Sequence, residues 1–145
     1  RGKALGLLVI RLCQMLDLDF MGWRETDEEL AAGGEVDALV DSARLIYSRW
    51  QIQCKVGPIR VGAVAKEVGM KDVTLANVIL VVGTKKATES ALTYRRRIVS
   101  TSNLNIIIID GPKLQRIVKE PSQLVEVLRE QARDALKLKS ALHGL

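Results

Sequence analysis

The chain has 145 residues, of which 48% are apolar and 27% are charged, and its formal net charge is +5. This length suits one domain with a substantial core, and this balance of apolar and charged residues excludes an intrinsically disordered chain. A positive net charge is compatible with a polyanionic partner such as DNA. The low aromatic content of 3% argues against a protein that stacks successive single-stranded bases.

Three further features bear on membrane association, redox compartment and domain organisation. Residues 4–10 form an apolar run that is far shorter than the about 20 residues of a membrane span, and no signal-peptide cleavage pattern follows it, so we expect no membrane association. Cys13 and Cys54 are the only cysteines, which favours a reducing cytoplasm. Because the first residue is Arg1 rather than methionine, we expect residues 1–145 to be a single domain from a longer protein.

The first part of the chain predicts a helix, a connection and a hairpin. Apolar residues at three- and four-residue spacing predict an amphipathic helix over residues 3–19. The glycines and acids of residues 20–34 predict a connection with a short helical turn. Alternating apolar residues then predict two strands, residues 36–40 and 50–56, joined by a loop.

The second part of the chain alternates apolar runs with amphipathic segments, which is the pattern of buried strands between helices. The predicted strands are residues 77–82 and 105–109. The predicted helices are residues 59–69 (ended by Gly69), 84–101, 112–119 and 121–142. Helix, hairpin and then strand–helix–strand–helix predict an α/β sandwich, with a central mixed β-sheet flanked by helices.

The two hairpin strands carry polar residues where a strand would be apolar. Side chains two positions apart share a face of a strand, so Glu35 shares a face with Asp37, and Gln53 shares one with Lys55. If the strands pair, carboxylates, an amide and an ammonium converge, which is a set suited to a divalent metal beside a phosphate. Taken alone, the same residues would also suit an exposed edge strand that a lysine protects.

The sequence around these residues is similar to a known family. Asp37 followed by Gln53-Cys54-Lys55 on an apolar strand resembles the PD-(D/E)xK nuclease signature in its Gln-x-Lys variant. Four segments, in the family's order, resemble the Mrr-like branch of restriction endonucleases and extend the likeness over residues 4–118. They are GGEVDALV (33–40), WQIQCK (50–55), NVILVVGTKKATESALTYRRR (77–97) and NIIIIDGPKL (105–114).

The resemblance implies a restriction-endonuclease-like fold, metal-dependent hydrolysis of DNA and a set of site residues. Asp37, Gln53 and Lys55 would be catalytic. Mg²⁺, or Mn²⁺ in its place, would be bound by Asp37, Gln53 and the backbone carbonyl of Cys54, with Glu35 as a further candidate ligand. Lys55 would orient the attacking water or stabilise the charge on the phosphate.

Two positions depart from the family's usual pattern. Gln53 stands where most relatives carry an acid, which removes one metal-binding charge, and Gly6 aligns where many relatives carry a glutamate on the first helix. These departures leave two alternatives to a restriction-type endonuclease. One is a structure-specific nuclease of the Holliday-junction resolvase kind, and the other is a catalytically silent nuclease-fold module that only binds DNA.

Basic residues in the second half suit a DNA partner. Lys85 and Lys86 follow a predicted central strand, at the edge where sites of open α/β sheets lie. We assign DNA-phosphate contact to these two lysines and to Arg95 and Arg96, although a solvated helix face would carry the same residues. Because one site cuts one strand, the resemblance also implies a homodimer, and a separate DNA-recognition domain upstream or downstream.

Overall fold

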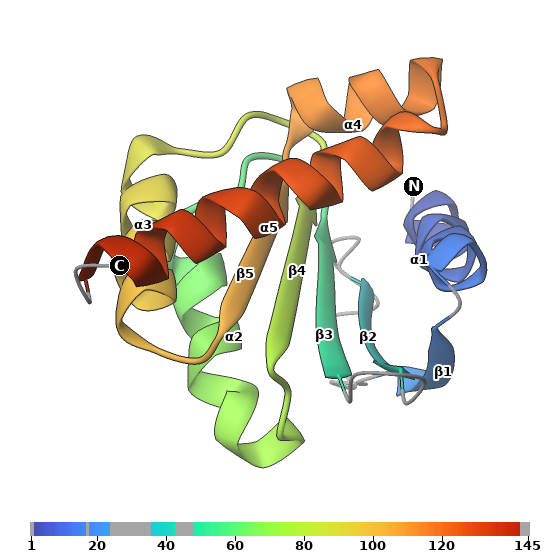
Figure 1. Ribbon diagram of the computed structural model, residues 1–145. Coiled ribbons are helices and arrows are strands. Elements are labelled where there is room, and N and C mark those ends of the chain that lie inside the picture. Colours follow the sequence, from blue (N-terminus) through green and yellow to red (C-terminus); the bar gives the residue numbers. More distant parts are fainter. Residues whose placement is uncertain (1, 17, 24–35, 43–47, 143–145) are drawn as a thin grey trace.

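The computed structural model describes residues 2–16, 18–23, 36–42 and 48–142. Within these ranges, one five-stranded mixed sheet lies between two layers of helices (Figure 1). The predicted α/β sandwich with a central mixed sheet is therefore confirmed. No helix in these ranges is long and apolar enough to cross a membrane.

The order of the strands across the sheet follows their order along the chain. The strands are β1 (Asp19–Trp23), β2 (Val36–Ser42), β3 (Ser48–Lys55), β4 (Val78–Gly83) and β5 (Asn105–Ile109). The helices are α1 (Gly2–Leu16), α2 (Val61–Thr74), α3 (Glu89–Thr101), α4 (Gly111–Lys119) and α5 (Gln123–Leu142).

The directions of the strands decide which residues meet at one edge of the sheet. Strands β1, β2 and β3 pair antiparallel, whereas β3, β4 and β5 pair parallel. Parallel neighbours need a crossover, and α2 and α3 supply the two crossovers. As a result the C-terminal ends of β3, β4 and β5 lie side by side, with Lys55 next to Gly83 and Val82 next to Ile109.

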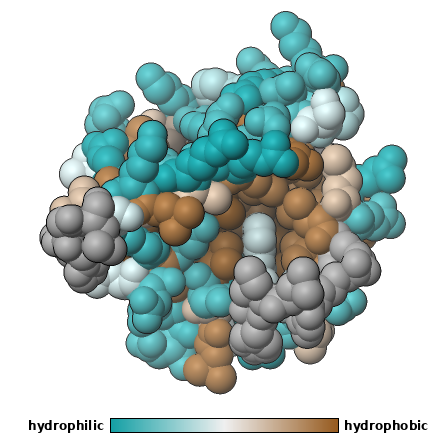
Figure 2. Space-filling model, in the orientation of Figure 1, coloured by the Kyte–Doolittle hydropathy of each residue, from teal (hydrophilic) through white to brown (hydrophobic). Residues whose placement is uncertain are grey.

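Apolar residues cover both faces of the sheet and form two cores. The first core joins the sheet to α1 and the start of α5, and its buried members are Val9, Leu12, Cys13, Ala38, Val40, Ile52, Cys54, Leu80, Val82, Ile107, Ile109, Leu124 and Val127. The second joins the sheet to α2, α3 and the end of α5, and its buried members are Ile59, Val64, Ile79, Val81, Ala87, Ala91, Val99, Leu104, Ile106, Ile108 and Ala135. Helix α5 therefore belongs to both cores, and its outer side is a hydrophilic band in Figure 2.

Three helices differ from the sequence prediction at one end, and the first of them, α1, ends at Leu16 rather than at residue 19. Helix α2 continues through Gly69, and Leu75, with a φ of 59°, adopts the left-handed conformation after its last turn. Helix α3 begins at Glu89 rather than at residue 84, because the hydroxyl of Thr88 accepts a hydrogen bond from the backbone nitrogen of Ala91 at 3.2 Å. The residues before this cap, 84–87, form a loop.

Strand β1 is the largest difference from the prediction. The sequence predicts a connection over residues 20–34, but Asp19–Trp23 pairs antiparallel with β2. The register shifts at a bulge between Phe20 and Gly22, and a bulge interrupts the alternation by which a strand is identified in a sequence. The rest of the predicted connection, residues 24–34, lies outside the described residues.

Side chains from α3 and α5 occupy the outer edge of β5. The amide of Gln131 accepts a hydrogen bond from the backbone nitrogen of Ile108 at 2.8 Å and donates one to its carbonyl at 2.7 Å. The guanidinium of Arg95 donates to the carbonyl of Ile106 at 2.6 Å and pairs with Asp134 at 2.7 Å. An edge strand occupied in this way is closed to pairing with another chain.

Lys139 of α5 holds the C-terminal end of α3. Its ammonium donates to the carbonyls of Val99, Ser102 and Leu104 at 2.7, 2.6 and 2.9 Å. The last carbonyls of a helix have no partner within the helix, and a cation there also interacts favourably with the helix dipole. Lys139 therefore ties the turn between α3 and β5 to α5.

We expect Lys139→Met to lower the free energy of unfolding by about 1–3 kcal/mol, because methionine keeps the packing of the stem and removes all three hydrogen bonds. Lys137→Met is the matched control, since Lys137 lies exposed on the same helix, and its effect should stay within about 0.5 kcal/mol. Urea denaturation of the two variants measures the difference. Equal stabilities would show that the contacts of Lys139 contribute nothing.

Candidate active site

The register of β2 against β3 brings three predicted site positions together. Asp37 pairs with Gln53 across the two strands, and cross-strand partners occupy the same face of an antiparallel pair. Lys55 lies two residues further along β3, on that same face, where the strand ends. Glu35 lies outside the described residues. The backbone thus places one carboxylate position, one amide and one ammonium at a single end of the sheet.

Gln53 is buried but incompletely hydrogen-bonded. It is 1% exposed, and its Oε1 has no hydrogen-bond partner within the described residues. Burying an amide oxygen without a partner costs about 1–3 kcal/mol. The Oε1 of Gln53 is one of five buried polar side-chain atoms without a hydrogen-bond partner in the described residues, and its place opposite Asp37 and two residues before Lys55 distinguishes it from the others. A cation bound at this oxygen would supply the missing partner, and amide oxygens are common ligands of hard divalent ions.

Cys54 lies between the two polar residues and faces the other way. Its side chain is buried in the first core with Ile52 and Val82. Its ligand to a metal would be the backbone carbonyl. Together with Asp37 and Gln53 this gives carboxylate, amide and carbonyl oxygens, a donor set that fits Mg²⁺.

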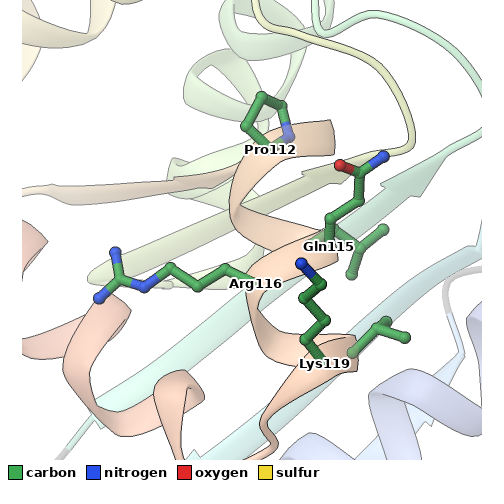
Figure 3. A pocket seen from close by; sticks show the side chains of 6 residues that line it. Pro112, Gln115, Arg116 and Lys119 are labelled. Carbon is green, nitrogen blue, oxygen red and sulfur yellow. The ribbon is translucent and has the colours of Figure 1, made fainter.

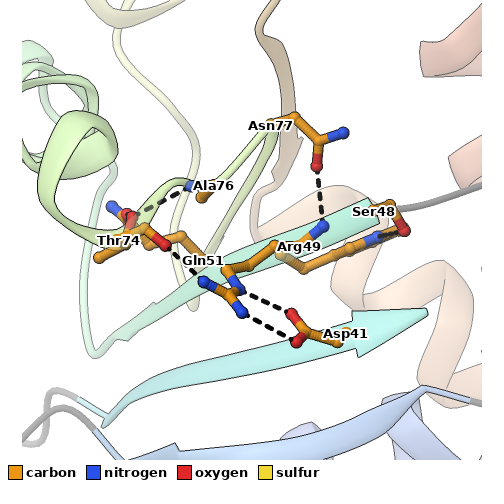
Figure 4. Close-up of polar contacts among 8 residues, drawn as sticks. Asp41, Ser48, Arg49, Gln51, Thr74, Ala76 and Asn77 are labelled. Carbon is orange, nitrogen blue, oxygen red and sulfur yellow. Dashed lines mark hydrogen bonds and ion pairs between the residues drawn. The ribbon is translucent and has the colours of Figure 1, made fainter. Parts of the chain in front are cut away.

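Gln51 lies on the same face of β3 as Gln53, and both its amide nitrogen and its amide oxygen are hydrogen-bonded. Its amide nitrogen donates to the backbone carbonyl of Glu67 at 3.0 Å and to the Glu67 carboxylate. Its amide oxygen accepts from the hydroxyl of Thr74 at 2.7 Å (Figure 4). Both ends of Gln51 are therefore held by α2, whereas the Oε1 of Gln53 has no such partner in the described residues.

Arg49 continues this polar row toward the start of β3. Its guanidinium makes two hydrogen bonds to Asp41, its partner across the hairpin, at 2.9 and 3.2 Å (Figure 4). Sequence reasoning missed the structural part of the row, Arg49 and Gln51 with their partners. The available signal was the alternation of polar residues along the strand, which begins four residues before Gln53 with Arg49 and continues with Gln51.

The loop of residues 84–87 lies directly against the end of β3. The backbone nitrogen of Thr84 donates to the carbonyl of Lys55 at 3.3 Å, and that of Lys85 donates to the carbonyl of Gly57 at 3.0 Å. The hydroxyl of Thr84 accepts from the nitrogen of Gly57 at 2.7 Å. Gly57 has a φ of 121°, which favours glycine. The exposed side chains of Lys85 and Lys86 thus flank the end of the site strand.

The assignment of Arg95 to DNA contact is wrong. Arg95 is 6% exposed, and its guanidinium is engaged by β5 and Asp134. The buried stripe of α3 consists of Ala91, Arg95 and Val99, so the arginine occupies a core-facing position. Arg96 is exposed and donates to the hydroxyl of Thr93 at 3.0 Å. Its contact with DNA stays a prediction.

A hollow of about 620 Å³ lies along α4 (Figure 3). Asp37, Gln53 and Cys54 are not among the residues that line it. The described residues that line it all belong to α4, and none of them is acidic. Arg116, which lines it, pairs with Glu130 of α5 at 2.8 Å. Neither its position nor its chemistry suits the binding of a divalent metal.

Comparison with known proteins identifies the family of the chain. The family model of the Mrr catalytic domain, described as a restriction endonuclease, matches residues 8–118. The match spans α1 to α4 and includes Asp37, Gln53 and Lys55. No curated protein and no solved structure matches the chain.

The contrast between the two buried glutamines makes a prediction about stability. We expect Gln51→Met to lower the free energy of unfolding by about 1–3 kcal/mol, because it removes the donor to Glu67 and the acceptor for Thr74. Gln53→Met should cost less than Gln51→Met or should stabilise the fold, because it removes a buried oxygen without a partner. Urea denaturation without divalent metal measures both. An equal loss in the two variants would show that Gln53 is held like Gln51.

Proposed function

Because this chain belongs to the restriction endonuclease family, with an Mrr-type catalytic domain over residues 8–118, it is a nuclease, and we propose that it is a Mg²⁺-dependent DNA endonuclease of restriction type. The observation that carries the proposal is the buried Oε1 of Gln53, which has no hydrogen-bond partner in the described residues and stands opposite Asp37 in the sheet. A polar atom of this kind, beside a carboxylate position and a lysine, is suited to a metal–phosphate site.

We propose that Asp37, Gln53 and the Cys54 carbonyl hold the ion. Mg²⁺ or Mn²⁺, when bound, lowers the pKa of a coordinated water and offsets negative charge on the phosphate. Lys55, half-buried at the end of β3, orients the water or stabilises the phosphate charge that develops during hydrolysis. Gln53 supplies an oxygen without a charge, so we expect weaker metal binding than with an acid at this position.

The DNA backbone would lie across the end of β3. Lys85 and Lys86 are exposed on a loop whose backbone is hydrogen-bonded to Lys55 and Gly57. Lysines at this place would contact phosphates next to the scissile one and position the duplex without reading its sequence. We propose Arg96 as a further phosphate contact and retain no such role for Arg95.

Cleavage of both strands needs two sites, and each chain supplies one. We therefore propose a homodimer of single nuclease domains comprising residues 1–145, with target recognition by a separate domain. Helix α5 is the candidate interface, because Val125 and Leu136 are large apolar residues exposed on it.

The test is plasmid cleavage in Mg²⁺ or Mn²⁺ by the wild-type chain and by Asp37→Ala and Lys55→Ala. We expect metal-dependent nicking that each substitution reduces by about 100-fold or more, because each removes a group that acts on the transition state. Lys71→Ala is the control. Lys71 lies in the last turn of α2, in a hollow with Asn77 and Ser102 at the start of the parallel strands, the opposite end of the sheet from Lys55.

Gln53→Glu tests whether Gln53 is a metal ligand. Adding a carboxylate at a metal ligand should shift the Mg²⁺ dependence of cleavage to lower concentrations, because ligand charge raises the affinity for a hard cation. An unchanged Mg²⁺ dependence would remove Gln53 from the ligand set. Equal activity of the wild type, Asp37→Ala and Lys55→Ala would overturn the site. Retained DNA binding without any cleavage would favour the silent DNA-binding module.

A further inference from the structure

The loop of residues 84–87 is fastened on a second side, away from β3. A carboxylate oxygen of Asp110 accepts a hydrogen bond from the backbone nitrogen of Ala87 at 3.0 Å. The backbone nitrogen of Gly111 donates to the carbonyl of Lys85 at 3.1 Å. Asp110 and Gly111 directly follow β5, so the end of this strand holds the far side of the loop, while Lys55 and Gly57 hold the near side.

Asp110 bonds to the loop and does not cap helix α4 with its side chain. It occupies the N-cap position of α4, where an aspartate ordinarily accepts from the first backbone nitrogens of the helix, yet its side chain makes no capping hydrogen bond. The carboxylate is directed to Ala87 instead, from a residue that is only 5% exposed. A buried ionised acceptor makes a stronger hydrogen bond than a neutral one, so the loop is held by a strong contact.

Gly111 allows the close approach on this side. A Cβ atom at this position would lie 2.9 Å from the carbonyl oxygen of Thr84 and 3.1 Å from the Cα of Lys85. Any larger residue would have to push the loop away from the start of α4. The backbone of Gly111 therefore sets the distance between α4 and the residues that carry the two lysines.

We propose that Asp110 and Gly111 are positioning residues for DNA: they hold Lys85 and Lys86 in place beside Lys55 for contact with the phosphate backbone. The inference rests on the proposed function, which supplies the phosphate at Lys55. A loop already ordered before DNA arrives loses little conformational freedom on binding, so holding it raises affinity without any contact between Asp110 and DNA. Lys113, whose ammonium lies 3.6 Å from the other oxygen of Asp110, offsets the negative charge so close to the duplex.

The direction in which Asp110→Ala changes the affinity for DNA distinguishes a positioning role from a purely electrostatic one. Asp110→Ala removes a negative charge, so electrostatics alone predicts tighter binding to DNA. Positioning predicts weaker binding, because the loop loses the acceptor for Ala87. Asp110→Asn makes the same change of charge but keeps an oxygen that can accept from Ala87, so it should bind at least as tightly as the wild type.

The experiment is a titration of a fluorescein-labelled duplex oligonucleotide with the full chain in EDTA, followed by anisotropy at several NaCl concentrations. Lys85→Ala with Lys86→Ala should weaken binding and reduce the slope of log affinity against log salt by about 2. Asp110→Ala should weaken binding severalfold. In the background without the two lysines, Asp110→Ala should have no further effect, because it acts through them.

Three results would overturn the inference. The first is that Asp110→Ala binds the duplex as tightly as the wild type or more tightly. The second is that Asp110→Asn loses as much affinity as Asp110→Ala, and the third is that Asp110→Ala lowers the affinity by the same factor when Lys85 and Lys86 are already replaced. If circular dichroism shows that Asp110→Ala does not fold, Gly111→Ala replaces it, since it displaces the loop without changing any charge. Binding by Gly111→Ala equal to that of the wild type would then overturn the inference.

Cleavage kinetics distinguish a failure of the positioning role from a failure of the proposed nuclease function. Asp110→Ala should raise KM and leave kcat at saturating DNA within about twofold, whereas Lys55→Ala should lower kcat. If the wild type cleaves but the binding results above fail, only the positioning role falls. If the wild type binds DNA without cleaving it, the nuclease proposal fails and the binding results still decide the role of Asp110.

Discussion

The pairing of β2 with β3 is the contact on which the site depends, because it sets Asp37 opposite Gln53. Its register is fixed by the opposite face of the same strands. Ala38 pairs with Ile52 there, and both residues are fully buried in the first core. A slip of one residue would exchange the faces and bring glutamines into that core, at a large cost in free energy. The apolar face therefore sets the geometry of the polar one.

The polar residues along β3 differ in how fully they are hydrogen-bonded from the start of the strand to its end. Arg49 and Gln51 are bonded to Asp41, Thr74 and Glu67, so both polar ends of Gln51 and the guanidinium of Arg49 have partners in this half of the row. Hydrogen bonds of this kind restrict the movement of the side chains that make them. At Gln53 the hydrogen bonds stop at an oxygen without a partner in the described residues. The hydrogen-bonded half thus holds β3 in place beside the half that contains Gln53.

The sequence reveals the strands of the parallel region because they are buried on both faces and read as continuous apolar runs. It also reveals the order of the elements, and so the edge where Lys55 and the loop of residues 84–87 meet. Strand β1 escapes detection because a bulge breaks its alternation. Helix α2 passes the glycine predicted to end it, since a leucine takes the left-handed position six residues later.

Arg95 shows why a charged residue is hard to assign from local pattern. It lies in a run of three arginines that resembles a DNA-binding surface, and two of the three are exposed. The acid that binds Arg95, Asp134, lies 39 positions further along the chain on another helix. Local spacing carries no sign of such a partner. The glutamines of β3 have the same difficulty, because tertiary contacts alone distinguish Gln51 from Gln53.

Helix α5 connects the far edge of the sheet to the site although it lies beyond the residues that the family model matches. Gln131 holds both backbone groups of Ile108, and Asp110 follows two residues later at the end of that strand. Asp110 fastens Ala87, and the same loop is bonded through Thr84 to the carbonyl of Lys55. At its strand end each of these contacts is made to or from a residue within β3 or β5 or directly after β5, where little movement is available. The position of the loop of residues 84–87 relative to Lys55 is therefore set from the end of the central strand β3 on one side and from the end of the edge strand β5 on the other. Helix α5, which holds β5, supports this arrangement although it carries no predicted catalytic residue.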